Sequence, residues 1–168
     1  MWNRSMLANI VEWVEQAYPS EGCGLVLELP DGGYRVQRCE NLADKYHALD
    51  PESFPRTSRE FYMINPMEFV RAEERGERVA VVFHSHPDVG DYFSPEDVAA
   101  AVMPRESADE PLQPSYPGTN YLVVSVRSGQ ADHATLFEFN EKEERFDGVK
   151  KFDKAALRVS DKLAAVGS

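Results

Sequence analysis

The sequence predicts an α+β fold, with a mixed central β-sheet flanked by helices. Two observations carry this prediction: several segments place apolar residues at helical spacing, and others show the short apolar runs and turn residues of strands and hairpins. With 168 residues, of which 42% are hydrophobic, the chain is long and apolar enough for one domain with a real core. We expect a single domain over residues 1–168, with its core at about 6–139 and a terminal tail at about 140–168.

A helix and a hairpin open the chain. Helical spacing predicts a helix from about Ser5 to Tyr18. Strand patterns at Leu25–Leu29 and Tyr34–Cys39, joined by a turn rich in glycine, predict a β-hairpin. Glu21 stands just before the first strand of this hairpin.

A polar region and a second helix follow. Glu40–Arg59 is rich in polar residues and contains two prolines, which predicts a long surface loop, with a helical turn as the lesser alternative. Glu60–Ile64 is predicted to be a short strand. Asn65 as N-cap and Pro66 at the first helical position predict a helix that ends near Gly76.

The second half of the chain supplies the predicted central strand. Arg78–His84 is apolar almost throughout, which suits a strand covered on both faces. A helix is predicted from Ser94 to about Met103, and Pro104–Gly118 is a second long loop with four prolines. The last predicted elements are strands at Tyr121–Val126 and Ala134–Phe139 and a helical pattern from Lys150 that includes Val159 and Leu163.

Charge excludes several classes of partner. Lys and Arg number 18 against 29 Asp and Glu, a formal net charge of -11 that repels phosphate backbones and anionic lipid headgroups. Glu12 and Glu15 interrupt the apolar residues of the amino terminus, so it lacks the core of a secretory signal. No later segment approaches the roughly 20 apolar residues that span a bilayer. We expect a cytoplasmic protein that binds neither nucleic acid nor membranes.

Two cysteines, Cys23 and Cys39, are too few for a disulfide scaffold. Their places in the predicted hairpin allow a bridge between neighbouring strands, but a reducing cytosol disfavours it. We therefore expect both to be buried or half-buried thiols.

Two histidines end the predicted central strand. In His84-Ser85-His86 the two imidazoles are two residues apart, and the strand period of two sends both to the same side. A zinc ion with a catalytic task needs three protein ligands and one open position, and histidine and carboxylate suit it. Asp97, eleven residues after His86 at a predicted helix start, can supply the third ligand when the loop folds back.

The motif resembles a known family of metalloproteases. The string Glu21, then His84-Ser85-His86-Pro87, six residues, then Ser94-x-x-Asp97 is similar to the JAMM (MPN+) motif at every defining position. The resemblance covers about Met6 to Phe139, and the order of predicted elements agrees with it. It implies the MPN/JAMM fold, which is cytidine-deaminase-like, and a stand-alone metallopeptidase of the bacterial and archaeal type.

The resemblance also implies a role for each site residue. One zinc ion per chain would be held by His84, His86 and Asp97, and zinc makes bound water acidic near neutral pH. Glu21 would act as general base and then as general acid toward the leaving amine. Ser94 would help to stabilise the oxyanion, a contribution typically worth roughly 10²–10³ in rate.

Each of these residues also has a plainer interpretation. Ser94 and Asp97 form a helix-capping signature, and both roles are compatible. Glu21 by itself would be a surface carboxylate, and the histidine pair by itself would be polar residues at a strand end. His47 and His133 are expected at the surface. Asp88 imitates the HxHxD of metallo-β-lactamase-like hydrolases, but Val89 stands where those enzymes need another histidine.

The resemblance implies a substrate class as well. Its members cut peptide or isopeptide bonds after the C-terminal Gly-Gly of ubiquitin or ubiquitin-like proteins, and short stand-alone members act on sulfur-carrier-like proteins or their conjugates. The loops 40–59 and 104–118 are candidate walls of the channel for such a tail, and Asp91-Tyr92-Phe93 can face either the core or this groove. The alternatives are a zinc peptidase for cell-wall or phage-tail peptides and a non-catalytic MPN-type scaffold.

Overall fold

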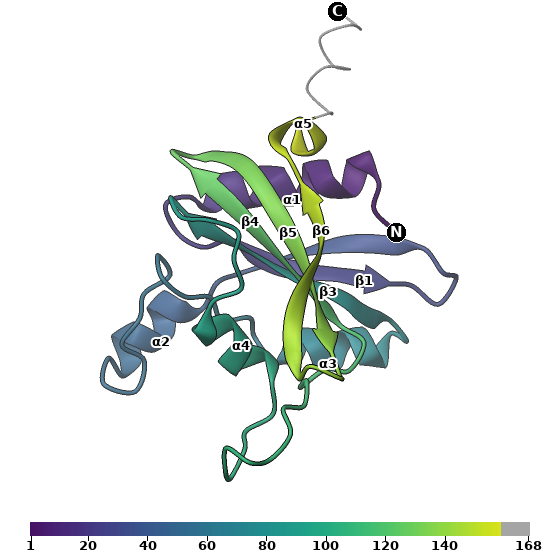
Figure 1. Cartoon of the computed structure of the whole chain (residues 1–168). Helices are drawn as coiled ribbons and strands as arrows, with labels where there is room; N and C mark the ends of the chain where they lie inside the picture. The colour runs from purple at the N-terminus through teal and green to yellow at the C-terminus, as the bar shows by residue number, and fades with distance from the viewer. Residues whose placement is uncertain (159–168) are drawn as a thin grey trace, which may run out of the picture.

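The computed structural model describes residues 1–158 and has the predicted α+β class (Figure 1). Its centre is a six-stranded sheet with the strand order β2-β1-β3-β4-β5-β6. Strands β3 and β4 are parallel and all other neighbours are antiparallel, so the sheet is mixed as expected. In chain order the elements are α1 (Arg4–Ala17), β1 (Cys23–Glu28), β2 (Tyr34–Cys39), α2 (Ala43–Leu49), α3 (Met67–Glu74), β3 (Arg78–Pro87), α4 (Pro95–Ala101), β4 (Asn120–Arg127), β5 (Gln130–Asn140), β6 (Arg145–Phe152) and α5 (Lys154–Leu157).

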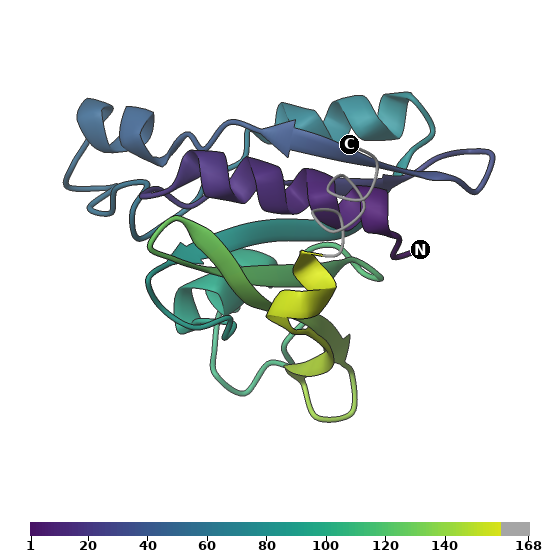
Figure 2. The same cartoon turned by 90° about the horizontal axis from the view of Figure 1, so that it is seen from above.

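Helices cover both faces of the sheet. In Figure 1, α1 lies above the strands, whereas α2, α3 and α4 lie below them; Figure 2 shows α1 lying along the sheet. The apolar side of α1 and Leu157 of α5 pack against strand residues in one core cluster. Buried alanines of α3 and α4 pack against strand residues in a second cluster. The two faces are therefore packed by different elements.

Strand β3 lies between β1 and β4 and contributes to both cores. Its side chains alternate: Val81 and Phe83 join the cluster beneath α1, and Val82 joins the opposite cluster. The same alternation places His84 and His86 on the face of Val82, beside α3 and α4. This explains why the strand is apolar almost throughout and why its histidines are buried.

Several sequence predictions are confirmed. The first helix, the hairpin, the central strand and the strands β4 and β5 lie where they were expected. Strand β3 continues past the predicted His84 to Pro87. Cys23 and Cys39 are direct neighbours across β1 and β2, and both are free, buried thiols. The loop 104–118 forms neither a helix nor a named strand.

Two predictions between residues 40 and 66 are wrong. The polar loop contains helix α2, which is held by tertiary contacts: the Asp44 carboxylate accepts hydrogen bonds from the backbone N–H and hydroxyl of Ser58. The expected strand at Glu60–Ile64 does not form, and Asn41 binds the backbone there with its side-chain amide. The apolar pattern has no neighbouring strand with which to pair. Buried backbone N–H and C=O groups still need hydrogen-bond partners, and here the Asn41 side chain supplies them.

The end of the sheet was also not predicted. Strand β6 pairs with β5 along its length, so the sheet extends beyond the expected core limit near residue 139. Only Phe152 of β6 is fully buried, and this edge strand therefore lacks the apolar alternation that identifies strands. Within residues 1–158, the helical pattern expected from Lys150 is strand β6 up to Phe152 and then helix α5. Its members Val159 and Leu163 lie outside the described residues.

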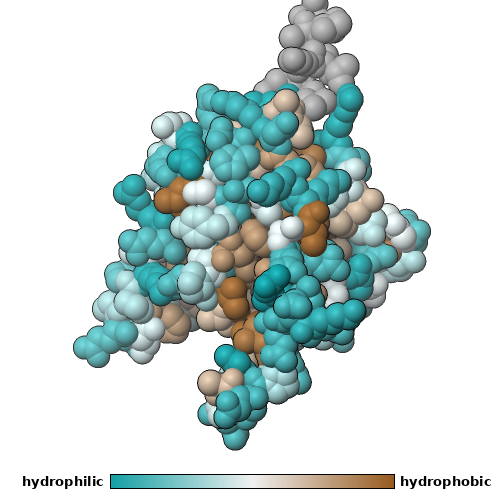
Figure 3. Space-filling view, viewed as in Figure 1, coloured by the Kyte–Doolittle hydropathy of each residue, from teal (hydrophilic) through white to brown (hydrophobic). Residues whose placement is uncertain are grey.

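The face shown in Figure 3 is mainly hydrophilic, and hydrophobic residues gather only in separate small patches. Among residues 1–158, no helix is long and apolar enough to cross a bilayer.

Candidate metal centre

The centre of the site is the end of β3. His84 and His86 face the same side of the sheet, as the strand period requires, and they are 0% and 4% exposed. Their Nε2 atoms lie 3.1 Å apart. Two imidazole nitrogens this close and this well buried need a shared proton or a shared cation between them.

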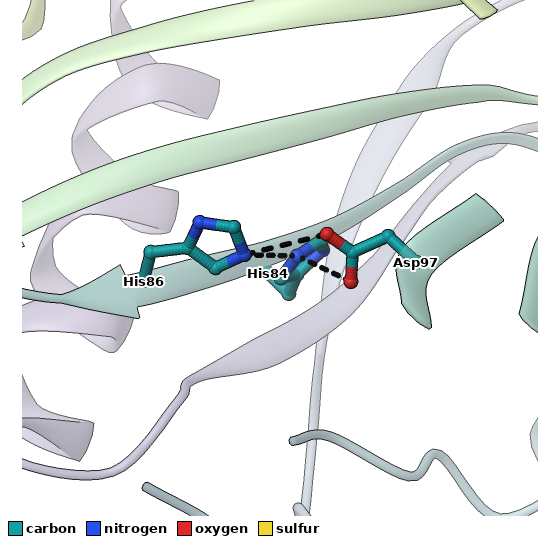
Figure 4. A group of neighbouring side chains, drawn as sticks. All are labelled: His84, His86 and Asp97. Atoms are coloured by element: carbon teal, nitrogen blue, oxygen red, sulfur yellow. Dashed lines mark hydrogen bonds and ion pairs between the residues drawn. The ribbon is translucent and has the colours of Figure 1, made fainter. Parts of the chain in front are cut away.

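Asp97 completes the group from the first turn of α4. The capping box of this helix fixes the carboxylate: Asp97 N–H donates to Ser94 Oγ at 3.1 Å, and the Asp97 Oδ2 atom accepts from Ser94 N–H at 2.9 Å. The Asp97 oxygens lie 3.2 Å from His84 Nε2 and 3.4 Å from His86 Nε2 (Figure 4). Capping and ligand geometry thus act together, because the cap aims the carboxylate at the histidines.

The spacing of these atoms fits a tetrahedral metal ion. Zinc binds histidine nitrogen and carboxylate oxygen at about 2.1 Å, and in a tetrahedron this gives ligand-to-ligand distances of about 3.4 Å. The distances of 3.1, 3.2 and 3.4 Å lie near that value. The two distances to Asp97 involve both of its oxygens, because His84 faces Oδ1 and His86 faces Oδ2. Within the part of the chain that is described, His84, His86 and Asp97 are the one group of three or more such side chains whose ligand atoms converge. They can hold a metal ion.

The ring of His86 is oriented by a backbone carbonyl. Its Nδ1 lies 2.8 Å from the Gly90 carbonyl oxygen, which can only accept, so Nδ1 carries the hydrogen. In the neutral ring Nε2 then carries the lone pair that a metal ion would bind. Tyr92 packs against the other side of the ring, with the centroids 5.0 Å apart.

The ring of His84 is oriented by packing. Tyr62 stacks on it with a centroid distance of 4.3 Å and an interplanar angle of 19°. The His84 Nδ1 atom is buried and has no hydrogen-bond partner among the described residues. The stacking therefore fixes the plane in which Nε2 points at the site.

The electrostatics favour a bound cation. Burial raises the pKa of Asp97, but hydrogen bonds from His84, His86 and Ser94 N–H lower it well below its usual range, so the carboxylate is charged. Burial lowers the pKa of His84. Burial also opposes charge on His86, but its hydrogen bond to Asp97 and the nearby Glu21 charge raise its pKa overall. A metal ion replaces the proton that this pair would otherwise share.

Strand register brings Glu21 to the site. In the antiparallel pair of β1 and β3, Cys23 lies opposite His84. Gly22 and Ser85 continue this pairing, since Ser85 N–H donates to Gly22 O at 2.9 Å and Gly22 N–H donates to Ser85 Oγ at 2.8 Å. This brings the preceding residue, Glu21, to the same end of the sheet, where His86 and Asp97 both affect its charge.

The Glu21 carboxyl is buried beside the three candidate ligands. Its residue is only 6% exposed, and burial raises the pKa of Glu21 to about 8, while His86 lowers it and Asp97 raises it. A cation held by the ligands would lower this pKa again. The backbone is fixed on both sides, because Glu21 N–H donates to Ser58 O at 2.7 Å and the Asn41 side chain donates to Glu21 O at 3.0 Å.

Of the other residues considered in the sequence, one lies beside the site and three lie outside the converging group. Ser94 caps α4 beside the site, and the bond from Asp97 N–H uses its oxygen but not its hydroxyl hydrogen. Asp88 lies outside the converging group; it accepts from Tyr18 Oη–H and from Ser128 N–H. His47 and His133 are half-buried and lie outside this group as well.

The contributions of Tyr62, Gly90 and Asn41 were not predicted. Asn41 and Tyr62 are polar or aromatic residues of the segment expected to be a loop and a strand, and neither belongs to a motif. Gly90 acts through its carbonyl oxygen, which every residue type possesses. Residue identity carries no signal for such a role.

Comparisons with known proteins agree with this architecture. The family model described as prokaryotic homologs of the JAB domain matches residues 3–137. This range contains Glu21, both histidines, Ser94 and Asp97. No curated protein matches the chain.

Two solution structures are similar to this chain. A protein from Salinibacter ruber is 27% identical, with 84% of this chain and 86% of that chain covered and a TM-score of 0.48. A protein from Desulfitobacterium hafniense is 22% identical, with 89% of this chain and 86% of that chain covered and a TM-score of 0.53. The second likeness supports the fold.

Proposed function

The chain belongs to the prokaryotic homologs of the JAB domain, and from this premise we propose that it is a zinc-dependent metallopeptidase. The observation that carries the proposal is the convergence of three buried groups, the two imidazoles of β3 and the carboxylate of α4, at distances near those of a tetrahedral site. The buried carboxyl of Glu21 lies beside them. A non-catalytic scaffold does not need this combination of a ligand set and a buried acid.

The donor set favours zinc. Two imidazole nitrogens and one carboxylate leave a fourth position open, which is the arrangement of catalytic rather than structural zinc sites. Zinc bound there would act as a Lewis acid toward a substrate carbonyl and would lower the pKa of water toward 7. Side chains of the protein would supply proton transfer and additional stabilisation of the oxyanion.

Glu21 is suited to proton transfer. Its carboxyl is buried near His86, and the backbone that carries it is held by Ser58 and Asn41. We assign it to accept a proton from the attacking water and to deliver that proton to the leaving amine. The same carboxylate returns to its charged form after each cycle.

Ser94 is suited to oxyanion stabilisation. Its oxygen is occupied by Asp97 N–H, which leaves the hydroxyl hydrogen to donate toward a developing negative charge beside the site. The cap bond holds the hydroxyl in place before the substrate arrives. This assignment gives Ser94 a structural task and a catalytic task at once.

For the substrate we propose the C-terminal tail of a ubiquitin-like, sulfur-carrier-like protein, cut at a peptide or isopeptide bond after Gly-Gly. Glycine permits an extended backbone to enter a narrow site. Of the two candidate walls, the segment 40–59 has contacts that support this role: Ser58 binds the backbone of Glu21, and Arg56 pairs with Glu96 of α4 at 3.1 Å. This segment therefore lies next to the proposed base.

The test combines metal analysis with mass spectrometry. Purified protein should contain about one zinc ion per chain, and it should shorten ubiquitin-like proteins that carry C-terminal extensions after Gly-Gly. Glu21→Gln should keep the zinc and lose cleavage. Absence of stoichiometric zinc contradicts the metal assignment, and cleavage only at other sequences contradicts the substrate. Undiminished turnover by the Glu21 variant removes that residue from its role.

A further inference from the structure

The loop between β3 and α4 lies over a row of polar side chains on the metal-site face. In the register of the sheet, His86 is opposite Ser125 of β4, and Ser125 is opposite His133 of β5. Two residues earlier on β3, His84 is opposite Val123 of β4, and Val123 is opposite Thr135 of β5. Paired residues of a sheet share a face, so these side chains stand beside the candidate ligands.

Two hydroxyl groups of this row hold residues 88–91, which we call the 88–91 loop. The Ser125 hydroxyl donates to the Val89 carbonyl oxygen at 2.5 Å. The Thr135 hydroxyl donates to Asp91 Oδ2 at 2.6 Å. Gly90 lies between the anchored residues Val89 and Asp91, and its carbonyl oxygen accepts the hydrogen bond from His86 Nδ1.

The anchors are well protected from solvent. Ser125 is 0% and Thr135 is 4% exposed. The second oxygen of Asp91 lies 3.1 Å from Nε2 of His133, whose Nδ1 lies 2.8 Å from Asp132. Asp91 is thus held from β5 at both oxygens, and short buried hydrogen bonds to a carboxylate are among the stronger ones.

We propose that Ser125 and Thr135 are positioning residues for metal binding, because they hold the 88–91 loop where the Gly90 carbonyl selects the Nδ1–H form of His86. A neutral imidazole has two tautomers, and the one with its hydrogen on Nε2 cannot bind a metal through that atom. Loss of an anchor lets the carbonyl move away and removes this preference. Such outer hydrogen bonds typically contribute about 10- to 100-fold in metal affinity.

This inference rests on the proposed metal site but not on peptide cleavage. Thr135→Val removes the hydroxyl with little change of shape, and Thr135→Ser restores it. The matched control is Thr119→Val at the other end of β4: Thr119 is also a buried threonine, and its hydroxyl donates to the Val79 carbonyl oxygen at 2.8 Å, far along the strand from the histidines. Ser125→Ala tests the second anchor.

Two measurements decide the proposal. Zinc affinity, measured by competition with a chelator, should fall about 10- to 100-fold in Thr135→Val and in Ser125→Ala, recover in Thr135→Ser, and stay near the wild-type value in Thr119→Val. Nitrogen NMR of the histidine rings in metal-free protein, at a pH where His86 is neutral, should show His86 with its hydrogen on Nδ1 in the wild type and a mixture of tautomers in Thr135→Val.

The outcomes separate this inference from the proposed function. Wild-type zinc affinity in Thr135→Val, with His86 unchanged, overturns the inference and leaves the metallopeptidase proposal intact. Equal loss of zinc affinity in Thr119→Val overturns it too, because the effect would then be general destabilisation. If the wild type binds no zinc, the proposed function fails, and the tautomer of His86 still tests the role of the anchors.

Discussion

Asp97 combines two tasks that a single substitution can separate. Its carboxylate faces both histidines and accepts the Ser94 N–H, whereas its own N–H donates to Ser94 Oγ. In Asp97→Asn the side chain keeps an oxygen that can accept the Ser94 N–H, and it loses the negative charge. The helix start should therefore survive while the ligand is lost.

The two effects differ greatly in size. Removing an N-cap side chain typically costs about 1 kcal/mol, so keeping an acceptor should limit the loss from the cap itself to less than about 1 kcal/mol of unfolding free energy. In metal-free protein the lost pairing of the carboxylate with the two histidines lowers the unfolding free energy further. Four-ligand zinc sites bind with about 10–16 kcal/mol, or about 2.5–4 kcal/mol for each ligand. Asp97→Asn should therefore weaken zinc binding about 10²- to 10³-fold.

The assay measures zinc affinity by chelator competition and stability by urea unfolding of metal-free protein. Ser94→Ala is the matched control, because it removes the hydroxyl that accepts from Asp97 N–H and leaves all three ligand groups. It should cost about 1 kcal/mol of stability and change zinc affinity only a few-fold. Unchanged zinc affinity in Asp97→Asn would refute the assignment of Asp97 as a ligand, and an equal loss in Ser94→Ala would show that the cap alone is responsible.

Three further outcomes are expected. His84→Ala should release zinc during dialysis, and one zinc ion retained per chain would exclude His84 as a ligand. Gly24→Ala should lower the unfolding free energy by about 1–3 kcal/mol, because the added Cβ would lie 2.4 Å from the Phe83 ring; a neutral effect in urea unfolding contradicts this packing. Hydrogen bonds from Arg35 and Arg75 lower the pKa of Glu77 from 4.5 to about 2. The carboxylate therefore stabilises the fold above about pH 5, and this contribution disappears as the pH falls toward 2. Glu77→Gln should be about 1 kcal/mol less stable than the wild type at pH 7 and equal to it near pH 2, as followed by urea unfolding at both values.

Parts of the fold whose evidence is local were predictable. The apolar spacing of α1 and the turn of the β1–β2 hairpin are properties of neighbouring residues, and both elements lie where the sequence places them. Strand β6 and helix α2 were missed for the opposite reason. β6 is an edge strand with mostly exposed side chains, and α2 is fixed by a contact between Asp44 and Ser58, fourteen residues apart.

The same division applies to the candidate metal centre. The strand period puts His84 and His86 on one side, and the Ser94-x-x-Asp97 pattern marks a helix start, so the sequence by itself determined these two pieces and, by resemblance, that they belong together. Only the tertiary structure decided that the Glu21 carboxyl is buried near His86 and that Ser125 and Thr135 hold the loop behind that ring. The physical reason is that register between strands depends on the packing of both faces of the sheet, whereas periodicity and capping depend on residues within one or two turns of the chain.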